Sequence, residues 1–109
     1  MIVKDYEIKF LEETVIIHTV SFGKSIFIYV GSFERNFNDL VVSMPNLTTT
    51  HLIGDSPSDE LCTASSEITK EPTIFSYSFP LENETDHERF DFVKISLRKI
   101  LKERYTKVL

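Results

Sequence analysis

Apolar and polar residues alternate near the start of the chain in a pattern that predicts β-strands. Tyr6–Leu11 alternates in the way that is typical of a strand with one buried face. The next run, Thr14–Phe22, is rich in β-branched residues, and Ser25–Val30 is apolar on both faces. Only short turns separate these three runs. Because parallel strands need long crossovers, we expect an antiparallel meander.

The middle of the chain predicts two shorter strands and then a helix. Leu40–Met44 has the composition of a fourth strand, and Thr48–Ile53 predicts a weaker fifth one. A helix is predicted over Pro57–Ile68, because proline suits the first helical position and Ser56 is a good N-cap. This helix has a narrow inward face of small and apolar residues, namely Leu61, Ala64, Ser65 and Ile68.

The last part of the chain predicts one strand and one long amphipathic helix. Thr73–Phe79 alternates between two faces, as a strand does. Thr85, followed three residues later by Glu88, matches a capping box, so we expect a helix that runs from there to about Lys107. Its apolar stripe, at helical spacing, consists of Phe90, Val93, Leu97, Ile100, Leu101 and Val108.

Together these elements predict a single α+β domain over residues 1–109, with two helices on one face of an antiparallel sheet of five or six strands. We expect one face of this sheet to be aromatic and the other to be aliphatic. The aromatic face would carry Phe27, Tyr29, Phe75, Tyr77 and Phe79, and the aliphatic face Ile26, Ile28 and Val30. Two helices cannot cover both faces. The other face is therefore predicted to be available for dimerisation, unless the loop over residues 33–37 folds over it.

Composition narrows the classes of partner and the cellular location. Twelve basic and seventeen acidic residues give a net charge of -5, which disfavours nucleic-acid binding. The single cysteine, Cys62, fits a reducing compartment and is expected to be a small packed residue. The first residues lack the apolar run of a signal peptide, and the longest apolar run, Ile26–Val30, is too short to span a membrane. We expect a soluble protein of the cytoplasm, with the nucleus as a second location.

Basic residues are concentrated in the last helix. The segment Lys94–Leu109 contains six basic residues and one acidic residue. One interpretation is a helix whose positive end complements its own dipole. The other is a strip, carried by Lys94, Arg98 and Lys102, that contacts an acidic partner. Phe92 and Ile95 lie opposite the apolar stripe and would be apolar anchors beside this strip, unless a loop covers them.

The loop between the third and fourth strands is a second candidate contact region. It carries two aromatic residues and an arginine, Phe33, Arg35 and Phe37, and such residues are favoured as anchors in protein interfaces. The alternative is that Phe33 and Phe37 pack into the core of the domain.

The sequence contains no motif that predicts catalysis. Three glycines in all cannot form a phosphate-binding glycine-rich loop. Cys62 and the histidines are scattered without the spacing of metal ligands, and His18 lies within an apolar strand where a structural role is expected. We therefore expect neither an enzyme nor a bound metal or cofactor.

Four segments in this order resemble the proteasome assembly chaperone 4 family. They are the apolar strand ending in glycine (Ser25–Gly31), the strand after a polar loop (Leu40–Met44), Leu52–Asp55 with the Ser/Asp-rich helix start after it, and Thr73–Phe79 followed by an amphipathic helix. The resemblance spans about residues 20 to 105.

The resemblance implies a non-enzymatic role in protein assembly. Members of this family pair with the related proteasome assembly chaperone 3. The pair promotes assembly of α-type subunits into the ring of the 20S core particle and then leaves. A homodimer of the isolated chain is also compatible with an uncovered sheet face. The alternative function is that of a small α+β adaptor that dimerises within a membrane-trafficking or GTPase-regulating complex.

Overall fold

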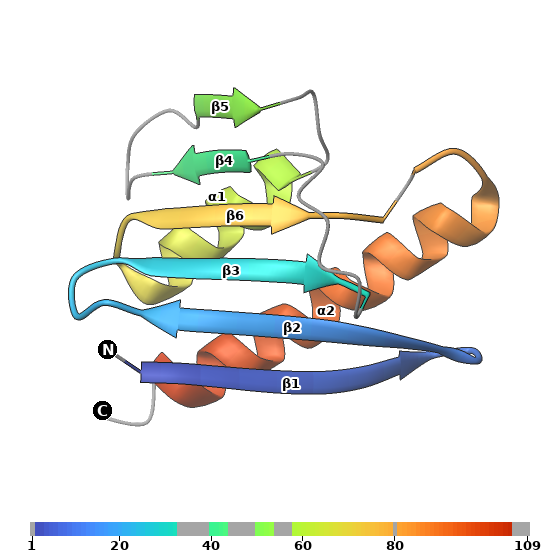
Figure 1. Ribbon diagram of the computed structural model, residues 1–109, viewed down its shortest axis with the longest axis horizontal. Coiled ribbons are helices and arrows are strands. Elements are labelled where there is room, and N and C mark those ends of the chain that lie inside the picture. Colours follow the sequence, from blue (N-terminus) through green and yellow to red (C-terminus); the bar gives the residue numbers. More distant parts are fainter. Residues whose placement is uncertain (1, 33–39, 44–49, 54–57, 80, 106–109) are drawn as a thin grey trace.

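Figure 1 shows the computed structural model of the chain, which describes residues 2–32, 40–43, 50–53, 58–79 and 81–105. Strands precede and separate two helices along the chain. The elements are β1 (Ile2–Phe10), β2 (Glu13–Ser21), β3 (Ile26–Gly31), β4 (Leu40–Ser43), β5 (Thr50–Ile53), α1 (Ser58–Thr69), β6 (Thr73–Tyr77) and α2 (Glu84–Tyr105). The predicted α+β class is confirmed.

The strands of the described residues form one six-stranded sheet in the order β1-β2-β3-β6-β4-β5. The predicted meander of β1, β2 and β3 is confirmed, since both of its strand pairs are antiparallel. The prediction of a wholly antiparallel sheet is wrong, because β6 pairs with β3 in parallel. The connection from β3 to β6 contains β4, β5 and α1, and a crossover of this length permits a parallel pair.

Both helices cover the same face of the sheet, which we call the helix face (Figure 1). The strand register places Ile17 beside Val30, and Val30 beside Tyr77, so their side chains share this face. The buried core between sheet and helices consists of Val15, Ile17, Ile26, Ile28, Val30, Leu61, Cys62, Phe75, Tyr77, Phe90, Val93, Leu97 and Leu101. Four members of the predicted apolar stripe of the last helix are therefore confirmed as core, Ile100 is partly buried against them, and Val108 lies outside the described residues.

Helix α1 packs its small residues against the sheet. Cys62 is fully buried, as expected, and its Sγ donates a hydrogen bond to the carbonyl oxygen of Thr73 at 3.3 Å. Lys70 follows the last residue of α1 with φ of 60°, and its N–H donates to the carbonyl oxygen of Ser66 at 2.9 Å. This left-handed residue ends the helix. The predicted cap Ser56 lies outside the described residues.

The start of α2 is held by a capping box two residues earlier than the sequence predicted. Asn83 Oδ1 accepts a hydrogen bond from the N–H of Asp86 at 2.9 Å, and Asp86 Oδ2 accepts from the N–H of Asn83 at 3.2 Å. The N–H of Glu82 also donates to Asp86 Oδ2. Thr85 and Glu88 have the same spacing as Asn83 and Asp86. The reciprocal hydrogen bonds are formed by Asn83 and Asp86, so Asn83 and not Thr85 is the cap.

Replacing Asp86 by asparagine is expected to lower stability at neutral pH and to flatten its acid dependence. The pKa of Asp86 is lowered by the N–H of Glu82 and by the guanidinium of Arg89. A lowered pKa contributes stability that is complete above the ordinary carboxyl pKa of about 4, and that is lost as the pH falls through the lower folded value. Unfolding by urea at a series of pH values between neutrality and about pH 2 measures both effects. Asp91→Asn, at an exposed position of the same helix, is the control, and equal pH profiles for the two variants would contradict the assignment.

Candidate protein-binding surface

The sheet face that points away from the helices, which we call the open face, carries a straight row of apolar side chains. The register places Val3 beside Val20, Val20 beside Phe27, and Phe27 beside Ile74. Ile74 in turn lies beside Val42. We call these five residues, which run across β1, β2, β3, β6 and β4, the apolar row.

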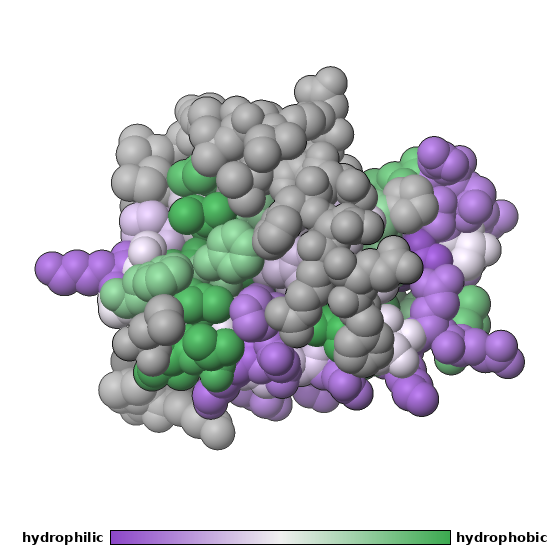
Figure 2. Space-filling view, viewed as in Figure 1, coloured by the Kyte–Doolittle hydropathy of each residue, from purple (hydrophilic) through white to green (hydrophobic). Residues whose placement is uncertain are grey.

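The apolar row is accessible along its length. The exposed fraction of Val3 is 51%, and the other four members are half-buried. Phe22, which is 55% exposed, follows β2 in the turn next to the row. Figure 2, viewed onto the open face, shows hydrophobic side chains gathered on its left, toward the end of the sheet where β2 turns into β3. A run of apolar residues on a surface differs from singly scattered ones and is typical of an interaction site.

The row next to the apolar row on the open face is largely polar, whereas the row after it contains the buried Ile16. Asp5 lies beside His18, whose Nδ1 contacts Asp5 Oδ1, and His18 lies beside Tyr29. The hydroxyl group of Tyr29 is 3.0 Å from Ser78 Oγ and donates to the carbonyl oxygen of Ser32 at 3.4 Å. On the open face, the apolar row is thus bordered on one side by hydrogen-bonded side chains.

Gly31 is required beneath the Tyr29 hydroxyl group. A Cβ atom at this position would lie 2.1 Å from Ser78 Oγ and 2.3 Å from Tyr29 Oη. Tyr29 itself is buried, although it belongs to the open face. We therefore assign Tyr29 a structural role, in place of the predicted role as an interface contact.

The predicted aromatic face is wrong. Phe27 and Tyr29 belong to the open face, whereas Phe75 and Tyr77 belong to the helix face and are buried in the core. The reason is the parallel register, in which Phe27 lies beside Ile74. Phe75 and Tyr77 are therefore core residues and not surface contacts, and burial raises the pKa of the Tyr77 phenol above its ordinary value.

Of the other predicted contact residues that the structure describes, Phe92 is half-buried, Lys94 forms an ion pair, and two are exposed. Phe92 packs on Phe10 of β1, with ring centroids 5.5 Å apart. Lys94 pairs with Glu60 of α1. Arg98 and Lys102 are exposed. Phe33, Arg35 and Phe37 lie outside the described residues.

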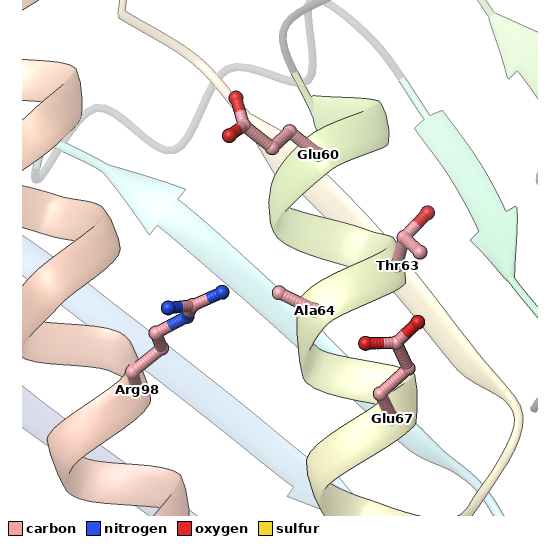
Figure 3. A pocket seen from close by; sticks show the side chains of 5 residues that line it. All are labelled: Glu60, Thr63, Ala64, Glu67 and Arg98. Atoms are coloured by element: carbon pink, nitrogen blue, oxygen red, sulfur yellow. The ribbon is translucent and has the colours of Figure 1, made fainter.

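An open groove of about 400 Å³ lies between the helices on the side opposite the open face (Figure 3). Arg98 extends from α2 toward α1, where Glu60, Thr63, Ala64 and Glu67 form the other wall. Lys94 and Arg98 of the predicted basic strip therefore face acidic residues of their own chain. The groove is a mixed-charge surface, so it does not favour an acidic partner alone.

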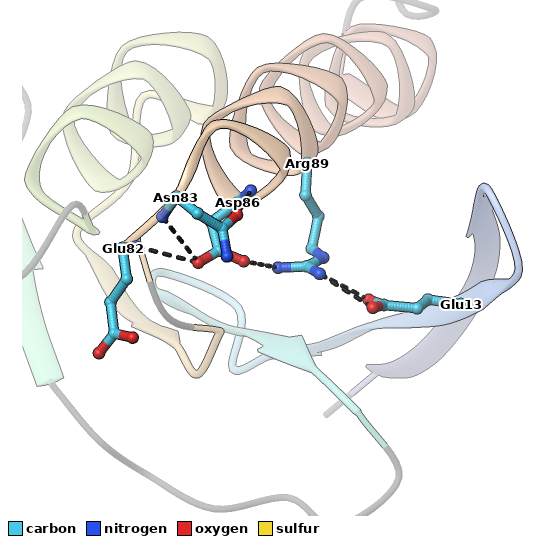
Figure 4. A network of polar contacts seen from close by, with 5 residues as sticks. All are labelled: Glu13, Glu82, Asn83, Asp86 and Arg89. Carbon is cyan, nitrogen blue, oxygen red and sulfur yellow. Dashed lines mark hydrogen bonds and ion pairs between the residues drawn. The ribbon is translucent and has the colours of Figure 1, made fainter.

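A buried arginine, which sequence reasoning missed, connects the start of α2 to β2 (Figure 4). The exposed fraction of the Arg89 side chain is 7%. Its Nη1 donates to Asp86 Oδ1 at 2.9 Å and its Nη2 donates to Glu13 at 2.9 Å, while its guanidinium carbon lies 4.8 Å from the centre of the Phe79 ring. An open surface pocket of about 410 Å³ adjoins this cluster, lined also by Thr14 and Ser32. Both carboxylates already engage the arginine, so the cluster is a structural tether.

Two further findings concern metals and membranes. Among the residues that the structure describes, no group of three or more His, Cys, Asp and Glu side chains is placed to hold a metal ion. Within the same residues, neither helix is long and apolar enough to cross a membrane.

Comparison with known proteins leaves the family open. No protein-family model matches this chain, and no curated protein matches it.

Proposed function

We propose that this chain is a non-enzymatic assembly chaperone that pairs with a related subunit, proteasome assembly chaperone 3, and promotes formation of the α-ring of the 20S proteasome. The observation that carries the proposal is the apolar row on the open face. The order of segments that resembles the proteasome assembly chaperone 4 family gives the partner. The α-type subunits of the proteasome are the clients of the pair.

The open face suits a second sheet as its partner. Two sheets that pack face to face interdigitate the side chains of their inner faces and align within about 30°. The apolar row would form the centre of such a contact, and the Asp5–His18 pair would lie beside it. Interfaces of this kind have an apolar core and a polar rim.

The groups with shifted pKa values also favour binding over catalysis. Asp86 caps α2 and bonds Arg89, and Tyr77 lies in the core between sheet and helices. Each shift therefore has a structural cause, whereas an enzyme places such groups together in a cleft that admits substrate.

Phe27→Asp is expected to weaken binding to the partner chaperone by about thirtyfold or more, because truncation of a central aromatic anchor typically costs about 2 kcal/mol or more. Phe27 is half-buried at the middle of the apolar row, so the isolated variant should still fold. Co-expression of the two chains, followed by calorimetric titration of the purified proteins, measures the effect. Leu11→Asp, at a 74% exposed position in the turn between β1 and β2, makes the same change of charge outside the row and is the matched control.

Two outcomes would contradict the proposal. One is unchanged affinity of Phe27→Asp for the partner while its circular dichroism spectrum is unchanged. The other is co-purification of the chain with a GTPase or a coat complex in place of proteasome α subunits, which would favour the adaptor function.

A further inference from the structure

Strand β1 forms one edge of the sheet, and only one of its sides is paired within the described part of the chain. It is nine residues long, and its pairing with β2 continues from Ile2 to Phe10 without a register shift. Natural edge strands are usually short, interrupted by proline or a bulge, or protected by charged side chains, because a long regular edge is a template for another strand. β1 has none of these interruptions, so its charges decide what pairs with it.

The outward backbone groups of β1 belong to its odd-numbered residues. The carbonyl oxygen of Lys4 points toward β2, since it accepts a hydrogen bond from Thr19 Oγ1 at 3.2 Å. In an antiparallel pair, successive residues direct their N–H and C=O groups to opposite sides. Asp5, Glu7 and Lys9 therefore direct theirs away from β2, where a further strand would bond to them.

The side chains of β1 differ between the two faces in a way that restricts the added strand. On the helix face, Tyr6 and Ile8 are half-buried and pack against the core. On the open face, Asp5, Glu7 and Lys9 are exposed. An added strand must therefore place apolar side chains on the helix face and complementary charges on the open face.

We propose that β1 pairs antiparallel with β1 of a second copy of this chain, about a two-fold axis that passes through Glu7. In this register Tyr6 of each copy lies beside Ile8 of the other, which continues the apolar layer of the helix face. Asp5 of each copy lies beside Lys9 of the other, which places opposite charges together twice. Asp5 already contacts His18, and a carboxylate accepts more than one donor.

Other registers that keep the two helix faces on the same side are less favourable. An axis through Tyr6 places Asp5 beside Glu7 twice, and an axis through Asp5 places two Asp5 carboxylates together. Like charges directly opposite each other destabilise a strand pair. An axis through Ile8 pairs Glu7 with Lys9 but shortens the overlap of the two strands. The axis through Glu7 combines a long overlap with one like-charge pair, Glu7 with its own copy.

The dimer extends the sheet across the edge, so it does not use the apolar row. The open faces of both copies stay on the same side, because the axis is perpendicular to the sheet. This interface is separate from the surface of the proposed function, and each can fail without the other.

Charge reversal at the two paired positions tests the dimer. Lys9→Asp places a second carboxylate beside Asp5 at both symmetric sites, and we expect the dimer dissociation constant to rise about tenfold or more. Combining it with Asp5→Lys exchanges the charges and should restore dimerisation toward that of the natural chain. Sedimentation velocity over a wide range of protein concentration measures all three proteins. A natural chain that stays monomeric, or a double variant no better than Lys9→Asp, would overturn the proposal.

The position of the axis is tested at Glu7. Glu7→Cys should form a disulfide-linked dimer on mild oxidation, because residues exchanging both hydrogen bonds have Cα atoms about 5.5 Å apart. Val3→Cys, exposed on the same face but beyond the overlap, should not. Glu7→Gln should tighten the dimer by removing the like-charge pair. Weaker dimerisation of Glu7→Gln would instead indicate the axis through Ile8 and would overturn the register proposed.

Discussion

Replacing Leu97 by alanine is expected to lower the free energy of unfolding by about 2–5 kcal/mol. Leu97 lies on α2 with an exposed fraction of 2%, within the core between the helix and the sheet. Its truncation removes buried apolar contacts and leaves a cavity that neighbours such as Val93 and Leu101 cannot fill without moving. Urea unfolding followed by circular dichroism measures the loss.

Ile95→Ala is the matched control for this prediction. Ile95 lies on the same helix and has a side chain of similar size, but its exposed fraction is 69%. Its truncation should change the free energy of unfolding by no more than about 0.5 kcal/mol. Similar losses for the two variants would show that α2 does not pack on the sheet through the face that contains Leu97.

Replacing Arg89 by methionine is expected to destabilise the protein by about 3 kcal/mol, because it removes one member of a buried, charged network. Methionine keeps most of the apolar length of the side chain but none of its donors. The carboxylates of Asp86 and Glu13 lose their hydrogen bonds to the guanidinium, and Phe79 loses the cation over its ring. The start of α2 would then no longer be tied to β2.

Arg98→Met provides the comparison for Arg89→Met, since Arg98 is an exposed arginine of the same helix. The substitution at Arg98 should be close to neutral. The thermal midpoint of both variants, measured at neutral pH, distinguishes the two positions. A neutral result at Arg89 would mean that the network contributes nothing to stability and that its carboxylates are satisfied by water.

The local elements could be predicted from the sequence, but the way in which distant strands pair could not. Alternation identified Thr73–Phe79 as a strand, and the structure confirms β6 at Thr73–Tyr77. Alternation is the same for parallel and antiparallel neighbours, so it did not show that β6 joins β3 in parallel. Alternation also leaves open the register of the pair, and the register decides which residue of β6 lies beside Phe27. Phe75 was therefore expected to share a face with Phe27, whereas Ile74 lies there.

The candidate surface could be predicted only in part for the same reason. The apolar character of Ile26–Val30 on both faces correctly indicated an open face with apolar residues. Whether Val20 and Ile74 belong to the apolar row depends on the strand register, so the sequence did not identify them as members.

The error in the predicted helix cap has a different cause, because Thr85 with Glu88 and Asn83 with Asp86 have the same spacing. Only the hydrogen bonds to Asp86 distinguish the two.

The parallel pair of β3 and β6 has a consequence for how the chain reaches its native state. The hairpins of β1, β2 and β3 join neighbouring segments, and such local contacts form early because they close short loops. β6 reaches the centre of the sheet only when the connection through β4, β5 and α1 has closed, which costs more chain entropy. Until then α2 has an incomplete surface on which to pack, since Phe75 and Tyr77 are missing from it. We therefore expect the folding rate to be set by the insertion of β6 beside β3.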